Sequence, residues 1–386
     1  MNAAPQEPAA KVRDGTCPGL VSVRSVVGML CAAALALLGA ASFAAPNIPT
    51  PFRGVLLSPT QATDAELTVA KQQGWNAVAL LLDEKTALDI APAAQRVSQA
   101  GFALFYWLEI GRNKAMADAH PEWMASLQGH PEWNRFFPQF KLPNAKAVAK
   151  TYPWVPLLYR ESFDAHRERV RRLLADQPVP RGVFLNDLQG APAACGCGHP
   201  LCRWTSDYGP IVTATRLGDD AAAQFVVAIK ALLPHSVVYP VWATECEQDD
   251  KAELCAGVGC YAGTCWRIWS RQLAPLAVES ETIGVLALGT TFQRKTEPTQ
   301  NEHTWPTKAL QAFERMPPQR EGKAIPTKRL LAVLEGWNVP MATARAQAQQ
   351  ALNAGAAGFL IAKTRIEQSW EPKVFQPRPT TPAAIP

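Results

Sequence analysis

Eight short apolar segments recur along the chain, and most of them are continuously apolar instead of alternating with polar residues. Segments patterned as amphipathic helices separate them, and such continuous runs are typical of parallel strands that are covered on both faces. The expected strands are 52–58, 76–82, 102–110, 181–188, 236–243, 282–289, 328–336 and 356–363.

Eight strand–helix units joined by right-handed crossovers predict an α/β fold that closes into one (β/α)8 barrel, also called a TIM barrel. Expected helices cover 63–74, 161–176, 212–233, 306–315 and 341–354. We expect long loops after strands three, four and five.

Three features count against the barrel. Pro240 lies inside the fifth strand, where proline removes a ladder donor. The last helix is missing or very short, and about 70 residues separate strands three and four.

The N-terminus has the pattern of a secretory signal peptide. Basic residues precede an apolar run, and Ser42 and Ala44 form a small-x-small cleavage pattern. We expect a signal peptide over 1–44, a barrel domain over 45–370 and a proline-rich disordered tail over 371–386. The protein is then secreted or periplasmic. An uncleaved membrane anchor is the alternative, because the run is long enough to span a bilayer.

Charge and motifs exclude several classes of function. The formal net charge is +5, and the leader carries three basic and two acidic residues, so the mature chain carries +4, scattered along the sequence. This is not the basic patch of a nucleic-acid-binding protein. The sequence contains no Gly-rich phosphate loop and no GxSxG, HExxH or CxxCH motif. We expect no nucleic-acid partner, no membrane contact after cleavage, no cofactor unless zinc is structural, and a monomer.

Acidic residues follow several of the expected strands, and in a barrel the catalytic groups lie where the strands end. The alternative for each is an ordinary salt bridge or helix cap, but several carboxylates on one rim weaken it. The acids are Asp83, Glu84, Glu109, Asp187, Glu245 and Glu335.

Tryptophan is frequent, with twelve residues, and several of them lie at or near the ends of the expected strands. An indole offers a flat face that matches the C–H face of a pyranose ring, so carboxylates and indoles on one rim suggest a sugar substrate. The alternative is that these residues pack beneath long loops. The expected substrate contacts are Trp107, Arg112, Asn186, Trp242, Glu245 and Trp337.

Three phrases of the sequence occur in an order that resembles secreted bacterial TIM-barrel glycoside hydrolases, over most of 52–365. They are "GVLLSP", "FALFYWLEIGR" with "HPEW" beyond it, and "PLLYRESFDAHRERVRRLLADQPVPRGVFLNDLQG". Retaining enzymes of the large glycosidase clan place an acid/base glutamate, preceded by Asn, after strand four and a nucleophile glutamate after strand seven. The resemblance implies Asp187 as acid/base, Glu335 as nucleophile or base, and Glu109 as an alternative partner.

The expected function is cleavage of a glycosidic bond by paired carboxylates. One carboxyl group protonates the leaving oxygen while the other attacks or activates water. Because Asp187 is one methylene shorter than glutamate, an inverting mechanism stays open beside the retaining one. Two other functions remain: a non-catalytic carbohydrate-binding barrel that has lost its acid pair, and a metal-dependent hydrolase that uses a Cys/His corner.

Seven cysteines follow the expected cleavage point, on the loops after strands four and five, which are neighbours in a barrel. They are Cys195, Cys197, Cys202, Cys246, Cys255, Cys260 and Cys265. Export to an oxidising compartment favours disulfides. The alternative is a structural zinc held by the first three cysteines with His199 or one of the later four. A catalytic or redox role is a third option.

Overall fold

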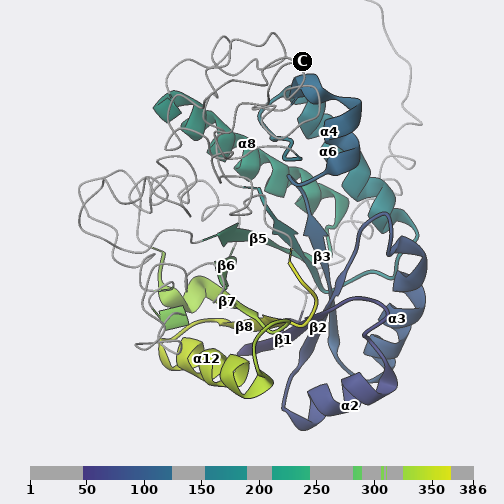
Figure 1. Ribbon diagram of the computed structural model, residues 1–386, viewed down its shortest axis with the longest axis vertical. Helices are drawn as coiled ribbons and strands as arrows, with labels where there is room; N and C mark the ends of the chain where they lie inside the picture. Colours follow the sequence, from purple (N-terminus) through teal and green to yellow (C-terminus); the bar gives the residue numbers. More distant parts are fainter. Residues whose placement is uncertain are drawn as a thin grey trace, which may run out of the picture. The chain divides into compact units, whose positions relative to one another are not determined.

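A computed structural model of the chain describes residues 47–123, 153–188, 211–243, 281–288, 306–307, 310 and 325–366. Eight parallel strands pair in sequence order and close into a barrel, which confirms the predicted (β/α)8 fold (Figure 1). Each strand lies within its predicted range. The strands are β1 (Phe52–Leu57), β2 (Ala77–Leu81), β3 (Ala103–Glu109), β4 (Gly182–Asn186), β5 (Val237–Ala243), β6 (Ile283–Ala287), β7 (Leu330–Glu335) and β8 (Gly358–Ala362).

Helices connect the strands and lie outside the strand ring (Figure 1). Thr63 caps the N-terminus of α2, since its side chain accepts a hydrogen bond from the backbone N–H of Glu66. Of the expected helix 306–315, only Pro306, Thr307 and Leu310 are described, within a helical turn. The helices are α2 (Asp64–Gln72), α3 (Ala87–Gln99), α4 (Lys114–Ala119), α6 (Arg160–Ala175), α8 (Ile211–Leu232) and α12 (Met341–Asn353), with 3-10 turns η1 (Pro121–Trp123) and η3 (Thr327–Arg329).

Four aromatic side chains contact one another inside the barrel. The ring of Phe184 on β4 lies 5.9 Å from that of Phe52 on β1, although these strands are not neighbours. Phe105 on β3 lies 5.1 Å from Phe52 and 5.6 Å from Phe184, and Tyr239 on β5 lies 5.4 Å from Phe184. Only side chains that point inward can meet across the ring, so these four positions define the interior face of their strands.

The strand register carries this interior face to the ends of the strands. Side chains alternate between the two faces of a strand, so a residue two positions beyond an inward-facing one also faces inward. On β4, Asn186 lies two residues beyond Phe184, and its register partner on β3 is Glu109. Both side chains therefore belong to the interior face at the carboxyl end of the barrel.

The same reasoning applies on the opposite side of the ring. Gly54, two residues beyond the inward-facing Phe52, pairs with Leu360 of β8, which pairs with Val333 of β7. Two residues beyond Val333 is Glu335, the last residue of β7. Glu335 consequently shares the interior face with Glu109.

Pro240 occupies a position in β5 where a missing N–H is tolerated. It forms the last pair with β4, opposite Leu185, and the ladder with β6 begins at the next residue, Val241. Proline is excluded from the middle of ladders and accepted at such ends. The objection that Pro240 raised against the barrel is thus removed.

The segment between β3 and α6 returns to the barrel beside its own starting point. Arg112 and Trp154 form an antiparallel bridge, the Val155 N–H donates to the Gly111 carbonyl over 2.8 Å, and the Asn113 N–H donates to the Pro153 carbonyl over 3.1 Å. We call residues 111–113 and 153–155 the clasp. It closes the long insertion that the sequence predicted after strand three, of which 124–152 are outside the described residues.

The predicted signal peptide, the proline-rich tail and most of the loops after β4 and β5 also lie outside the described ranges. Within those ranges, no helix has the length and apolar character needed to cross a membrane.

Candidate functional site

The carboxylate of Glu109 is held by two side-chain donors at the carboxyl end of the barrel. The indole Nε1 of Trp107 donates to Oε1 over 2.7 Å, and the Nδ2 of Asn186 donates to Oε2 over 2.7 Å. Each oxygen accepts one N–H group, and donors to a carboxylate favour its charged form. Glu109 as a whole is intermediate between buried and exposed.

Glu335 lies across the barrel from Glu109. β3 and β7 are four strands apart in a ring of eight, which places them on opposite sides, and both acids end their strands on the interior face. Glu335 is completely buried. A substrate could therefore reach its carboxyl group only if the groups that cover it move.

Asp187 departs from the regular strand geometry. Its φ is +62°, in the left-handed region that aspartate tolerates better than most residues, and it is 6% exposed. A Cβ added at Gly111 would lie 2.6 Å from the Asp187 carbonyl and would also clash with the indole of Trp154. Glycine at 111 thus lets the clasp approach the turn that follows β4.

Two rim acids have structural partners. The Oδ1 of Asp83 accepts from the backbone N–H groups of Lys85 (2.9 Å) and Thr86 (2.8 Å) and from the Thr86 hydroxyl (3.0 Å), so it fixes the turn that leads into α3. Glu84 forms an ion pair with Arg169 of α6. For these two acids the predicted alternative of a cap or a salt bridge is confirmed.

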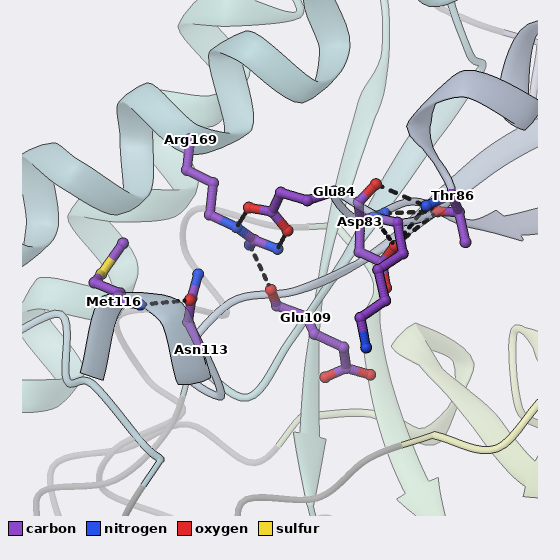
Figure 2. A network of polar contacts seen from close by, with 8 residues as sticks. Asp83, Glu84, Thr86, Glu109, Asn113, Met116 and Arg169 are labelled. Atoms are coloured by element: carbon purple, nitrogen blue, oxygen red, sulfur yellow. Dashed lines mark hydrogen bonds and ion pairs between the residues drawn. The ribbon is translucent and has the colours of Figure 1, made fainter. Parts of the chain in front are cut away.

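Arg169 connects the ends of two strands from the inner side of α6 (Figure 2). Its Nε and Nη2 donate to the two carboxylate oxygens of Glu84 over 2.6 and 2.9 Å, and its Nη1 donates to the backbone carbonyl of Glu109 over 2.8 Å. The guanidinium is almost completely buried. Burial raises the pKa of Glu84, but the hydrogen bond and the charge of Arg169 outweigh this and hold the pKa below its ordinary value.

Two further polar residues of α6 bind the carbonyls of Val155, in the clasp, and of Pro156, the residue that follows it. The Ser162 hydroxyl lies 2.5 Å from the Pro156 carbonyl, and the Nε2 of His166 donates to the Val155 carbonyl over 3.1 Å. His166 is completely buried; burial, assisted by the positive charge of Arg169, lowers its pKa to about 3. The imidazole is consequently neutral near neutral pH.

The sequence contains a signal for these residues in the spacing of the α6 helix. The buried positions of α6 are 162, 166, 169, 170 and 173, which is the spacing of one helix face. Three polar residues, Ser162, His166 and Arg169, lie on that face, and buried polar groups require partners. The polar stripe of α6, as we call these three residues, was therefore visible in the helical pattern.

The tryptophans predicted as substrate contacts lie in different environments. Trp107 is completely buried and stacks on Phe184 at a ring distance of 5.7 Å. Trp242 is completely buried and lies three residues beyond the inward-facing Tyr239, so it is on the outer, helix-facing side of β5. Trp337, directly after β7, is partly exposed at the edge of the core.

Of the remaining predicted site residues, only Arg112 lies within the described ranges. Arg112 is half-buried in the clasp. Glu245 and all seven cysteines lie outside the described residues, so the choice between disulfides and zinc stays a prediction. Among the described residues, no three His, Cys, Asp or Glu side chains gather as a metal site would require.

The fold and the site define a (β/α)8 barrel protein with carboxylates at the carboxyl end of its strands. No family model matches the sequence, and no curated protein does. Several solved structures are similar to it at low identity. An endo-1,4-β-D-mannanase from Thermotoga petrophila RKU-1 is 12% identical, with 81% of this chain and 87% of that chain covered and a TM-score of 0.44.

Two other structures show a similar degree of likeness. The active domain 2 of a chitinase from Pyrococcus furiosus is 8% identical, with coverage of 82% and 84% and a TM-score of 0.42. The carboxyl transferase domain of Rhizobium etli pyruvate carboxylase is 10% identical, with coverage of 84% and 46% and a TM-score of 0.37. Likenesses of this size do not extend to activity, and the fold is established by the ring of paired strands itself.

Proposed function

We propose that the protein is a glycoside hydrolase that cleaves an oligo- or polysaccharide with two carboxyl groups at the mouth of the barrel. The observation that carries this proposal is the placement of Glu109 and Glu335. Both end their strands on the interior face, on opposite sides of the ring. Glycoside hydrolysis needs two carboxyl groups that flank one bond.

Glu109 has the environment of the base or nucleophile. Both of its oxygens accept N–H groups, from Trp107 and Asn186, so the carboxylate is oriented by donors that favour its charged form. Glu335 then supplies the proton to the leaving oxygen. Asp187, the acid/base that the resemblance implies, is the alternative acid, since it follows Asn186 at the same rim.

The test begins with a screen of aryl glycosides and oligosaccharides to find a substrate. Glu109→Gln and Glu335→Gln should each fold normally and lower turnover by at least about a hundredfold, the scale of losing a general acid–base group. Glu168→Gln is the matched control, because Glu168 pairs with Arg171 on the exposed side of α6. Near-normal turnover by both mouth variants would refute the assignment.

The roles can be separated with substrates of different leaving groups. A dinitrophenolate departs without protonation, so the acid variant should keep most of its activity on dinitrophenyl glycosides, whereas the base or nucleophile variant should not. We expect this rescue for Glu335→Gln. Rescue of Asp187→Asn in place of Glu335→Gln would move the acid role to Asp187.

A non-catalytic carbohydrate-binding barrel is the second candidate, and the complete burial of Glu335 favours it. It predicts oligosaccharide binding without turnover of any glycoside in the screen. Isothermal titration of oligosaccharides into the unaltered protein and into Trp337→Ala measures this binding. Binding that is lost in Trp337→Ala, together with no turnover by the unaltered protein, supports the binding barrel, whereas turnover supports the hydrolase.

We also propose export and cross-linked cysteines. N-terminal sequencing of exported protein should begin at Ala45, and a retained leader would contradict cleavage after Ala44. Thiol counting with and without reductant should reveal at least two disulfides among the seven cysteines, whereas seven free thiols with one bound zinc would assign the corner to metal.

A further inference from the structure

Arg169 contacts the one peptide carbonyl that belongs to the proposed base or nucleophile. Its guanidinium spans from the Glu84 carboxylate, which it binds through two nitrogens, to the Glu109 carbonyl, which it binds through the third at 2.8 Å (Figure 2). The side chain is 6% exposed, whereas that of Glu84 is 60% exposed. The buried member of the pair is therefore the one that contacts the catalytic strand.

A buried guanidinium is costly to desolvate, and such a pair is weak evidence for stability alone. Surface acids and arginines elsewhere on α6 show the cheaper arrangement. Arg171 makes the same two-nitrogen contact with Glu168, at 2.7 and 2.6 Å, but on the exposed side of the helix. Because it is buried, Arg169 can also donate a hydrogen bond to the end of β3, which a surface pair cannot do.

The hydrogen bond from Arg169 to the Glu109 carbonyl acts on the residue whose carboxylate lies at the proposed site. The Glu109 side chain is held at both oxygens by 2.7 Å hydrogen bonds, and these bonds tolerate little movement of its backbone. The adjacent Ile110 N–H donates to the Asn186 carbonyl over 3.1 Å. Fixing the Glu109 carbonyl therefore fixes the carboxylate relative to both of its donors.

We propose that Arg169 is a positioning residue for Glu109: from α6, it fixes the peptide whose carboxylate Trp107 and Asn186 orient at the mouth of the barrel. This inference rests on the proposed function for its effect on turnover. Its structural part, that the Glu109 carboxylate moves when Arg169 is changed, stands independently of any substrate.

The variant that tests it is Arg169→Lys, which keeps the charge but cannot reach both Glu84 oxygens and the Glu109 carbonyl with one planar group. Arg171→Lys is the matched control. The readout that needs no substrate is the indole N–H resonance of Trp107 in a spectrum of 15N-tryptophan-labelled full-length protein, assigned with Trp107→Phe. That proton lies in the hydrogen bond to Glu109 Oε1.

We expect Arg169→Lys to shift the Trp107 indole resonance and to lower kcat by at least about tenfold with KM nearly unchanged, because small misplacements of a reacting group are expensive. Arg171→Lys should change neither. An unshifted Trp107 resonance in a folded Arg169→Lys protein would overturn the proposal and leave Arg169 a structural residue. If Arg169→Lys does not fold, Glu84→Gln tests the same link: a smaller shift in the same resonance supports the proposal, and no shift overturns it.

The two proposals fail in different ways. If the unaltered protein turns over no glycoside, the proposed function fails, while the Trp107 resonance still decides whether Arg169 positions Glu109. If turnover is present and lost in Glu109→Gln but unaffected in Arg169→Lys, the function stands and the positioning role is refuted.

Discussion

Asn186 and Glu109 form the last register pair between β4 and β3, and the Asn186 amide donates to the Oε2 of Glu109 over 2.7 Å. Neighbouring strands thus supply an acid and its donor at the same level of the barrel. The sequence placed Asn186 among the substrate contacts, whereas its observed partner is a protein carboxylate.

Removing this donor should impair catalysis without unfolding the protein. A hydrogen bond to a charged group contributes about 1.5–3 kcal/mol, so Asn186→Ala should lower kcat by about tenfold or more. Steady-state kinetics on the substrate found by screening will measure it. An unchanged kcat would show that the bond is not needed to orient Glu109.

Trp107 and Trp337 should respond in opposite ways to substitution. Trp107 is buried and donates to Glu109, so Trp107→Phe should lower kcat with little change in KM. Trp337 is partly exposed, so Trp337→Ala should raise KM with less effect on kcat. Oligosaccharide titration checks the second effect directly, and a KM effect for Trp107→Phe would instead indicate sugar contact.

The Glu84–Arg169 pair should make stability sensitive to acid. Because the folded pKa of Glu84 lies below its ordinary value of 4.5, the pair stabilises the fold above pH 4.5 and this contribution is lost as the pH falls through the folded pKa. Exposure of the Glu84 side chain screens the effect to at most about 1 kcal/mol. Urea unfolding of Glu84→Gln and unaltered protein should differ at pH 7 and converge below pH 4.5.

His166 should add a second acid sensitivity in a higher range. Its folded pKa of about 3 lies below the ordinary 6.5, so the unfolded chain binds a proton between these values that the folded protein does not. Stability therefore decreases as the pH falls from 6.5 toward 3. His166→Gln should flatten the dependence of the unfolding free energy on pH by up to one proton, and identical slopes would show that His166 does not remain neutral.

Gly111 should not tolerate a side chain. A methyl group there would meet the Asp187 carbonyl at 2.6 Å and the Trp154 indole, so Gly111→Ala should destabilise the fold by about 1–3 kcal/mol, the usual cost of overpacking. Thermal unfolding will measure the change. An unaltered melting temperature would mean that the clasp shifts freely away from β4.

The barrel was predictable because its strands are continuous apolar runs of the right length, such as 330–334, which is flanked by polar residues. The site was predictable only in part. That Glu109 and Glu335 end strands is visible in the sequence, but their shared interior face depends on the register of the ladders, which no local pattern records. The contact between Arg169 and Glu109 joins residues 60 positions apart, and the Asp187 carbonyl lies close to Gly111, which is 76 positions away in the sequence.

Ala362 pairs with Glu335 in the ladder between β7 and β8 and shares its interior face. Its orientation is dictated by backbone hydrogen bonds around a closed ring, not by the methyl group itself, and the residue is fully buried. A single codon change there would add a reactive side chain beside an existing acid while the backbone stays as it is. In evolutionary terms, the backbone of the barrel can stay the same while side chains at the strand ends change, and Ala362 is a position where a new catalytic group could arise.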